Sequence, residues 1–278
     1  MRPADIHDGL TDAELAAALY RFANEPGRDL LSERETDIGE AEFARTATLE
    51  QVARIERDLY EVAVPQTILD LQHRHDERLA DVHFRFGDAV YALHRLIDAR
   101  RRLVIVTVNY DELAEHEHGA ALDIAVDDDD FRRLVPILAN MRTGGDHPDG
   151  KIPLLKLHGT LNRPATCVVT DEQTRSGITP AKAGALMALV QDLPPNQRVQ
   201  WVYVGASMRD IDLDRIFGAH EFNQSVSERW VAPWPEDSVR RFVYAKNRWW
   251  AAAGETLLDR TVTETADAFM NALDNQWT

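Results

Sequence analysis

The sequence has a single cysteine, Cys167, among 278 residues. One cysteine cannot form a disulfide within the chain, and it cannot supply the ligands of a four-cysteine zinc module. Long apolar runs are also missing, because uninterrupted apolar stretches extend over a few residues, against the roughly 20 that a membrane-spanning helix needs. The first ten residues, MRPADIHDGL, lack the apolar centre of a signal peptide. We therefore expect no membrane association and a cytoplasmic location.

Basic residues are few: 31 Lys and Arg stand against 47 Asp and Glu, which gives a formal net charge of −16. Such a charge repels phosphate backbones, so we expect no direct nucleic-acid binding through a basic surface. Apolar residues make up 44% of the chain, which excludes disorder of the whole chain. At roughly 100 to 200 residues per domain, the length suits one large domain or two small ones.

The first part of the chain has a helical pattern. Thr11 or Asp12 is suited to cap a helix that carries Leu15, Leu19 and Phe22 on one face, and a second helix is expected after Gly87. No convincing strand precedes residue 103. Residues 1–85 are therefore predicted to form a helical N-terminal segment.

At residue 103 the pattern changes to that of an α/β domain. The run LVIVTV at 103–108 is continuous and β-branched, as is typical of strands buried on both faces of a parallel sheet. Further strands are predicted at 153–157, 166–169, 200–204 and 229–232, and helices at 131–141, 181–192, 212–222, 236–252 and 263–274. The alternation predicts a Rossmann-like parallel sheet flanked by helices over 86–252, followed by a C-terminal helix within 253–278. The acidic run at 127–130 indicates a solvated loop or a helix start.

Three of the predicted strands are followed by polar segments. They are NYD at 109–111, HGTLN at 158–162 and GASMRD at 205–210. Each alone also has a purely structural explanation, as a helix cap, a turn or a tight strand-to-helix joint. Ligands of open α/β sheets bind beyond the carboxyl ends of the strands, so a parallel sheet would bring all three segments to one site.

These segments resemble a known family. VTVNYDEL at 106–113, LKLHGTLN at 155–162, VVTDEQ at 168–173 and YVGASMRDID at 203–212 are similar, in this order, to SIR2-like domains of bacterial anti-phage defence proteins. The resemblance spans roughly residues 85–250. It implies cleavage of the bond between nicotinamide and ribose in NAD⁺, with NAD⁺ as substrate and no metal. It also implies a partner protein of the defence system and a homo-oligomer.

The resemblance assigns roles to individual residues. Asn109 would hold the ribose and a water molecule, Asp111 would orient this loop, and His158 would be the general base, since an imidazole exchanges protons near neutral pH. The residues that would bind the dinucleotide are Thr107, Gly205 and Ser207. Protein-deacetylating sirtuins carry a four-cysteine zinc module, which this chain cannot build, so lysine deacylation is not expected.

The chain departs from the family at the phosphate-binding loop. The family's first strand normally leads into a Gly-Ala-Gly segment, whose backbone amides hold the pyrophosphate. Before Gly87 the only glycines are Gly9, Gly27 and Gly39, and none follows a strand-like run. Either the chain begins downstream of that element or the loop has been lost. In the second case the alternative to an enzyme is a catalytically inactive module that binds a nucleotide or a partner protein.

Two pairs of histidines lie outside these motifs. His73 and His75 are two residues apart, as are His116 and His118, and this spacing on a helix places the side chains on different faces. We therefore expect no metal site at either pair. For His116, which follows the first motif, a solvent-facing position on a helix is favoured over one in the ligand site.

Overall fold

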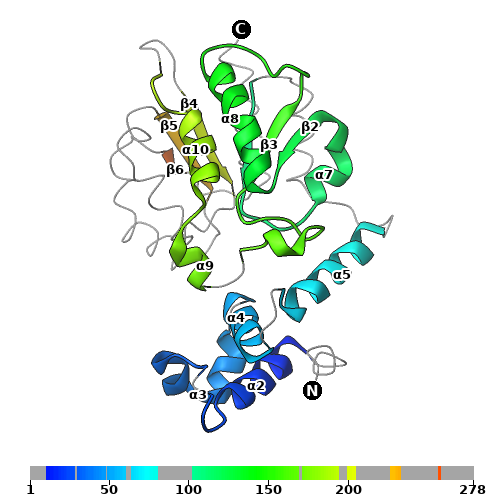
Figure 1. The fold of residues 1–278 in the computed structure, drawn as a ribbon, viewed down its shortest axis with the longest axis vertical. Coiled ribbons are helices and arrows are strands. Elements are labelled where there is room, and N and C mark those ends of the chain that lie inside the picture. Colours follow the sequence, from blue (N-terminus) through cyan, green and yellow to red (C-terminus); the bar gives the residue numbers. More distant parts are fainter. Residues whose placement is uncertain are drawn as a thin grey trace. The chain divides into compact units, whose positions relative to one another are not determined.

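The fold was analysed in a computed structural model that describes residues 11–28, 30–47, 49–60, 64–80, 102–168, 171–193, 199–204, 226–232 and 256–257. The chain divides into two compact units (Figure 1). The first, called the helical unit below, takes in Met1–Val82, Asn109–Asp111 and His158–Arg175. The second, called the sheet unit, takes in His83–Val108, Glu112–Leu157 and Ser176–Thr278. The helical unit therefore contains two segments that come from the middle of the chain.

The described residues of the N-terminal region form helices that follow one another in the helical unit. They are α2 (Asp12–Ala23), α3 (Glu33–Thr46), α4 (Leu49–Tyr60) and α5 (Gln66–Ala80). The predicted cap at Thr11 is confirmed, because its side chain accepts from the backbone N–H of Glu14 in a capping box. Ser32 and Glu35 form the same arrangement at the start of α3. The expectation of helices rather than strands in the described part of this region is also confirmed.

A buried apolar cluster holds α2, α3 and α4 together. Leu19, Phe43 and Ile55 are each 0% exposed at its centre, and the rings of Tyr20 and Phe43 lie 5.4 Å apart between centroids. Complete burial of such side chains contributes about 1.5 to 3 kcal/mol each. The sequence pattern of Leu15 and Leu19 correctly identified the buried face of α2.

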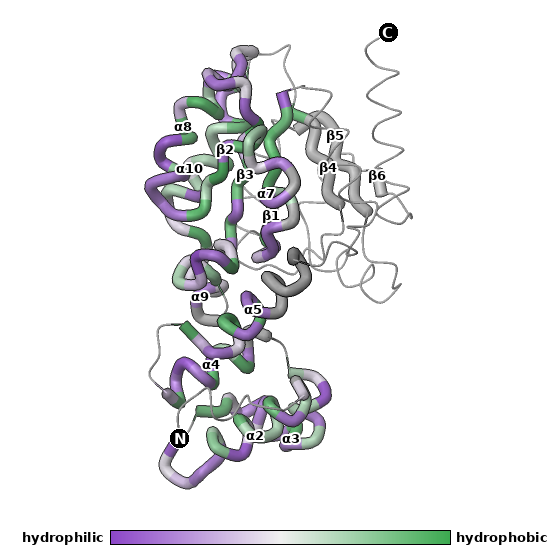
Figure 2. Tube along the Cα trace, turned by 90° about the vertical axis from the view of Figure 1, so that its right-hand side faces the viewer, coloured by the Kyte–Doolittle hydropathy of each residue, from purple (hydrophilic) through white to green (hydrophobic). Residues whose placement is uncertain are grey.

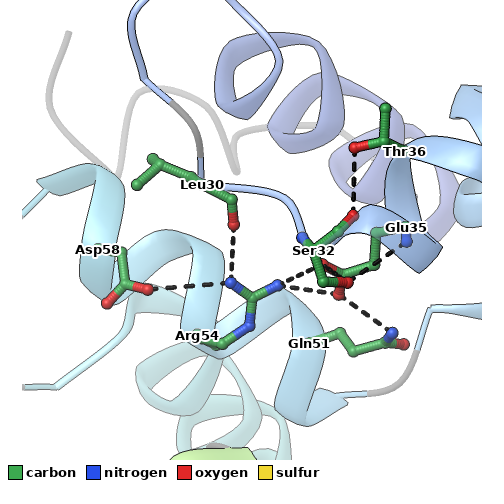
Figure 3. Close-up of polar contacts among 7 residues, drawn as sticks. All are labelled: Leu30, Ser32, Glu35, Thr36, Gln51, Arg54 and Asp58. Atoms are coloured by element: carbon green, nitrogen blue, oxygen red, sulfur yellow. Dashed lines mark hydrogen bonds and ion pairs between the residues drawn. The ribbon is translucent and has the colours of Figure 1, made fainter.

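A buried ion pair connects α3 with α4 (Figure 3). Glu35 is 4% exposed, and its carboxylate accepts hydrogen bonds from the backbone N–H and the hydroxyl of Ser32, both at 2.8 Å. The Arg54 guanidinium reaches its two oxygens at 2.7 and 2.8 Å, and Gln51 donates at 3.2 Å. Arg54 also donates to the carbonyl of Leu30 at 2.8 Å, so the same cation fixes the loop before α3.

The described residues of the sheet unit form two parallel sheets of three strands each. The first has the order β1-β3-β2, from β1 (Ile105–Thr107), β2 (Leu122–Ala125) and β3 (Ile152–Lys156). The second has the order β4-β5-β6, from β4 (Val199–Val204), β5 (Val226–Ala232) and β6 (Thr256–Leu257). Parallel strands with intervening helices confirm the predicted α/β, Rossmann-like fold with a helical N-terminal segment.

The remaining elements connect these strands. Helix α7 (Leu113–His118) and the 3₁₀ turn η1 (Gly119–Ala121) lead from β1 to β2, and α8 (Asp128–Arg142) leads from β2 to β3. After β3 come the 3₁₀ turn η2 (Pro164–Thr166), α9 (Asp171–Ser176) and α10 (Pro180–Ala188). The acidic run at 127–130 is a helix start, because the Asp127 side chain accepts from the N–H groups of Asp129 and Asp130.

Alternate residues of the first sheet face opposite layers. Leu155 and Leu157 lie in a buried cluster with residues of α8 and α10, whereas Ile152 and Leu154 lie in a second cluster with Ala114 of α7. Helix α8 mixes hydrophobic and hydrophilic residues along its length, as expected of a helix with one buried face (Figure 2). The central strand β3 is thus covered on both sides.

Most predicted strands and helices within the described residues are confirmed, but one is wrong. The segment 166–168 is not a strand: Pro164–Thr166 forms η2, and the N–H of Val168 turns back to the carbonyl of His158 at 2.9 Å. Strand β2 was not predicted. The expected helices at 212–222, 236–252 and 263–274, and the one after Gly87, lie outside the described residues.

The Glu35 carboxylate should make the helical unit sensitive to acid. Burial alone would raise the pKa of Glu35, but the hydrogen bonds from Ser32 and the charge of Arg54 outweigh it and lower the pKa below 4.5. A carboxyl with a lowered pKa stabilises the fold above its unfolded pKa, and this stability is lost as the pH falls through the folded pKa.

Glu35→Gln is therefore expected to cost about 3 kcal/mol at neutral pH, because the half-buried Arg54 guanidinium loses its counter-charge. The cost should shrink at about pH 3, below the ordinary pKa of a glutamate, because the unfolded chain there binds the proton more readily than the folded one. Urea unfolding followed by circular dichroism at both pH values measures this difference. Glu33→Gln, an exposed residue of the same helical turn, is the control. An equal cost at both pH values would contradict the prediction.

Candidate functional site

Two predicted site residues follow neighbouring strands at equivalent positions. In the parallel pair of β1 and β3, Thr107 is the partner of Lys156, and the N–H of Leu157 donates to the carbonyl of Thr107 at 2.9 Å. Two residues further along each chain lie Asn109 and His158. The register thus places the two polar segments after the same ends of neighbouring parallel strands, and that they form one ligand site stays a prediction.

The segments after the two strands are joined by hydrogen bonds within the helical unit. The N–H of Leu161 donates to the carbonyl of Tyr110 at 3.0 Å, and the Tyr110 hydroxyl donates to the carbonyl of Val168 at 2.6 Å. The bond from the Val168 N–H to His158 closes the loop at 158–168. This loop and Asn109–Asp111 form one connected structure, which carries three of the predicted site residues.

The predicted site residues differ in their exposure. His158 is 5% exposed, Asp111 is half-buried and Asn109 is exposed. Thr107, at the end of β1 in the sheet unit, is half-buried. Gly205 and Ser207 lie outside the described residues, so their place in the site stays a prediction.

The backbone conformation directly after His158 requires a glycine at position 159. Its φ of +88° lies in the left-handed region, which side chains other than glycine's rarely adopt. A Cβ at this position would also collide with the backbone carbonyl oxygen of Thr166, at the end of η2. A glycine at position 159 is therefore needed for the close approach of this backbone to Thr166, independently of any ligand.

Apolar residues of α4 and α5 support this loop. Leu161 and Cys167, 2% and 4% exposed, form a buried cluster with Ala53 of α4 and Ile68 of α5, and Tyr110 packs against it. The Cys167 thiol donates to the carbonyl of Thr160 at 3.3 Å. The cysteine is thus a small buried residue of the loop core.

Two buried lysines near the end of β3 were not found by sequence reasoning. Lys182 of α10 is 6% exposed, and its ammonium donates to the carbonyl of Leu157 at 2.7 Å and lies 5.7 Å from the centroid of the Phe131 ring. Lys156 of β3 is 0% exposed and pairs with Glu115 of α7 at 2.5 Å. Both lysines lie in segments with an apolar or amphipathic sequence pattern, and nothing in the neighbouring residues indicates that these lysines are buried.

A second polar cluster lies elsewhere in the sheet unit. Asp123 of β2 accepts two hydrogen bonds from Arg133 of α8, at 2.6 and 2.7 Å, and lies 2.9 Å from Nε2 of His147. Nδ1 of His147 accepts from the N–H of Asp149, so Nε2 carries the proton toward Asp123. The hydrogen bond from Arg133, which outweighs burial, lowers the pKa of Asp123 together with that from His147. These bonds fix the connection between α8 and β3.

The histidine pairs are placed on helices, as the sequence predicted. His73 and His75 lie in α5, and His116 and His118 in α7, where His116 is exposed. Among the residues that the structure describes, no group of three or more His, Cys, Asp or Glu side chains is arranged to hold a metal ion. None of the helices in these residues is long and apolar enough to cross a membrane.

The parallel sheet and the polar segments at its carboxyl end define an α/β domain of the dinucleotide-binding type. Residues 103–258 match the SIR2-like domain family, and because this match covers more than half of the chain, the protein belongs to that family. Membership supports a sirtuin-related function linked to NAD. A search of curated proteins gave no significant match.

Replacing Gly159 should test the loop geometry. Gly159→Ala adds a collision with the Thr166 backbone to the strain of a positive φ, whereas Gly27→Ala, at φ +90° with open space around it, adds the strain alone. We expect a cost of about 1 kcal/mol for Gly27→Ala and about 2 kcal/mol more for Gly159→Ala. Thermal unfolding compares the two variants. Equal destabilisation would show that the loop does not require the close approach.

Proposed function

We propose that the protein is an NAD⁺ glycohydrolase, which cleaves NAD⁺ to nicotinamide and ADP-ribose. The observation that carries the proposal is the register of β1 and β3, which sets Asn109 and His158 at equivalent positions after neighbouring parallel strands of a SIR2-like domain. A ligand that reaches this end of the sheet would meet an amide and an imidazole from two adjacent segments.

The chemistry needs groups of this kind. The bond between the ribose C1′ and the nicotinamide nitrogen breaks with its electron pair going to the nitrogen, which loses its positive charge. The ribose gains oxocarbenium character, and a water oxygen then bonds to C1′ while one water proton passes to a base. Because nicotinamide is a good leaving group, orienting the sugar and the water matters more than a strong nucleophile.

Each candidate site residue has its own role in this reaction. His158 takes the proton of the attacking water, and its burial keeps the imidazole out of bulk solvent. The exposed amide of Asn109 binds the ribose and the water, and Asp111 orients the same loop. Dinucleotide binding falls to Thr107, Gly205 and Ser207.

The resemblance also suggests a biological role. We propose that cleavage depletes NAD⁺ during phage infection, that it takes place in the cytoplasm, and that the protein acts as a homo-oligomer with a partner protein of a defence system. None of these requires a metal or direct contact with nucleic acid.

One observation favours the second candidate, a catalytically inactive SIR2-like module that binds a nucleotide or a partner. The two described glycines that precede β1 lie among helices: Gly27 follows α2, and Gly39 forms a kink within α3. Neither follows a strand, so neither supplies the phosphate-binding loop of the family. This module would bind without turnover, and nicotinamide release by the pure protein would exclude it.

The test is nicotinamide release from NAD⁺ by the purified protein at neutral pH. We expect Asn109→Ala and His158→Ala to lose at least about 100-fold in kcat, because each removes a group that acts in the transition state. His73→Ala, an exposed histidine of α5, is the matched control and should keep full activity. Circular dichroism checks that all variants are folded. Wild-type turnover retained in both site variants would refute the assignment of these residues.

A further inference from the structure

We propose that Tyr110 is a positioning residue for the candidate active site, an inference that rests on the proposed cleavage of NAD⁺. It lies between Asn109 and Asp111 in the sequence, but its side chain is directed to the other loop of the site, where its hydroxyl donates to the carbonyl of Val168 at 2.6 Å. It therefore links the segment that carries the amide to the loop that carries the imidazole.

The link reaches His158 through one intermediate residue. Val168 accepts the Tyr110 hydroxyl at its carbonyl, and with its N–H it donates to the carbonyl of His158 at 2.9 Å. A second bond, from the N–H of Leu161 to the carbonyl of Tyr110 at 3.0 Å, joins the same two segments through the backbone. Tyr110 thus contacts the loop at 158–168 both near its start and at its end.

The helical unit holds Tyr110 in this place. Its ring packs against the buried cluster in which Ala53 and Ile68, both 0% exposed, meet Leu161 and Cys167. Close packing resists displacement of the ring, so the hydroxyl is presented to Val168 from a fixed support. The N-terminal helices thus support Tyr110 through the same buried cluster that supports the loop at 158–168.

The expected consequence is catalytic. Asn109 and His158 must act on the same ribose, and a displacement of about 1 Å between them can cost about 100-fold in rate. Removing the hydroxyl leaves the ring and its packing in place but releases Val168, and with it the end of the loop that begins at His158. The loss should therefore appear in kcat, while the affinity for NAD⁺ changes little.

The experiment compares Tyr110→Phe with Tyr20→Phe. Tyr20 is a matched control, because its hydroxyl also donates to a backbone carbonyl of the helical unit, that of Thr36 at 3.4 Å. Neither Tyr20 nor Thr36 belongs to the loops that carry Asn109 and His158. We expect kcat for nicotinamide release to fall about 10- to 100-fold in Tyr110→Phe, with KM changed less than about 3-fold. Tyr20→Phe should match the wild type.

Amide hydrogen exchange gives a readout that needs no turnover. The N–H groups of Leu161 and Val168 should exchange faster in Tyr110→Phe and unchanged in Tyr20→Phe. Unchanged exchange, or an equal loss of kcat in both variants, would overturn the proposal. If the wild type released no nicotinamide, the proposed function would fail, and exchange at these two amides would still show whether the Tyr110 hydroxyl holds the loop at 158–168 in place.

Discussion

The register between β1 and β3 is the constraint on which the rest of the structure depends. Pairing of Thr107 with Lys156 sets the point at which both strands end, and the bond from Leu157 to Thr107 extends the pairing by one residue. A shift by one residue would turn the buried face of β3 outward and would separate Asn109 from His158 along the strand direction. Two buried cations lie at this strand end: Lys156 is the last residue of β3 and pairs with Glu115, and Lys182 donates to the carbonyl of Leu157, the next residue.

The segments that carry Asn109 and His158 belong to the helical unit. They are fixed by hydrogen bonds among themselves and by apolar contacts with α4 and α5 of the same unit. The Glu35–Arg54 pair, which joins α3 to α4, contributes to the stability of this unit.

Sequence patterns predicted the features that depend on neighbouring residues, and they missed features that depend on contacts between distant residues. The strand at 103–108 and the cap at Thr11 were predicted correctly because a β-branched run and a capping box are local patterns. The strand predicted at 166–169 is wrong over 166–168, because Cys167 is buried in a loop that is closed by the bond from the Val168 N–H to the carbonyl of His158. Strand β2 was missed, since four residues of mixed polarity carry little signal of their own.

The sequence likewise indicated candidate site residues but not the contacts that hold them. Polar residues after apolar runs pointed to Asn109, Asp111 and His158. The partners that hold them were not visible, because Tyr110 and Val168 are 58 residues apart and Lys182 is 25 residues from Leu157. Such contacts arise only from the folded topology. The dependence of Gly159 on the backbone of Thr166 belongs to the same class, although the His-Gly pair itself was noticed.

The central claim is that this end of the sheet directs a water molecule to the ribose of NAD⁺. Its most direct test is incubation of the purified protein with NAD⁺ at neutral pH, followed by chromatography and mass spectrometry of the products. The account predicts free nicotinamide and ADP-ribose in equal amounts. Recovery of intact NAD⁺, or release of nicotinamide with a product other than ADP-ribose, would contradict it.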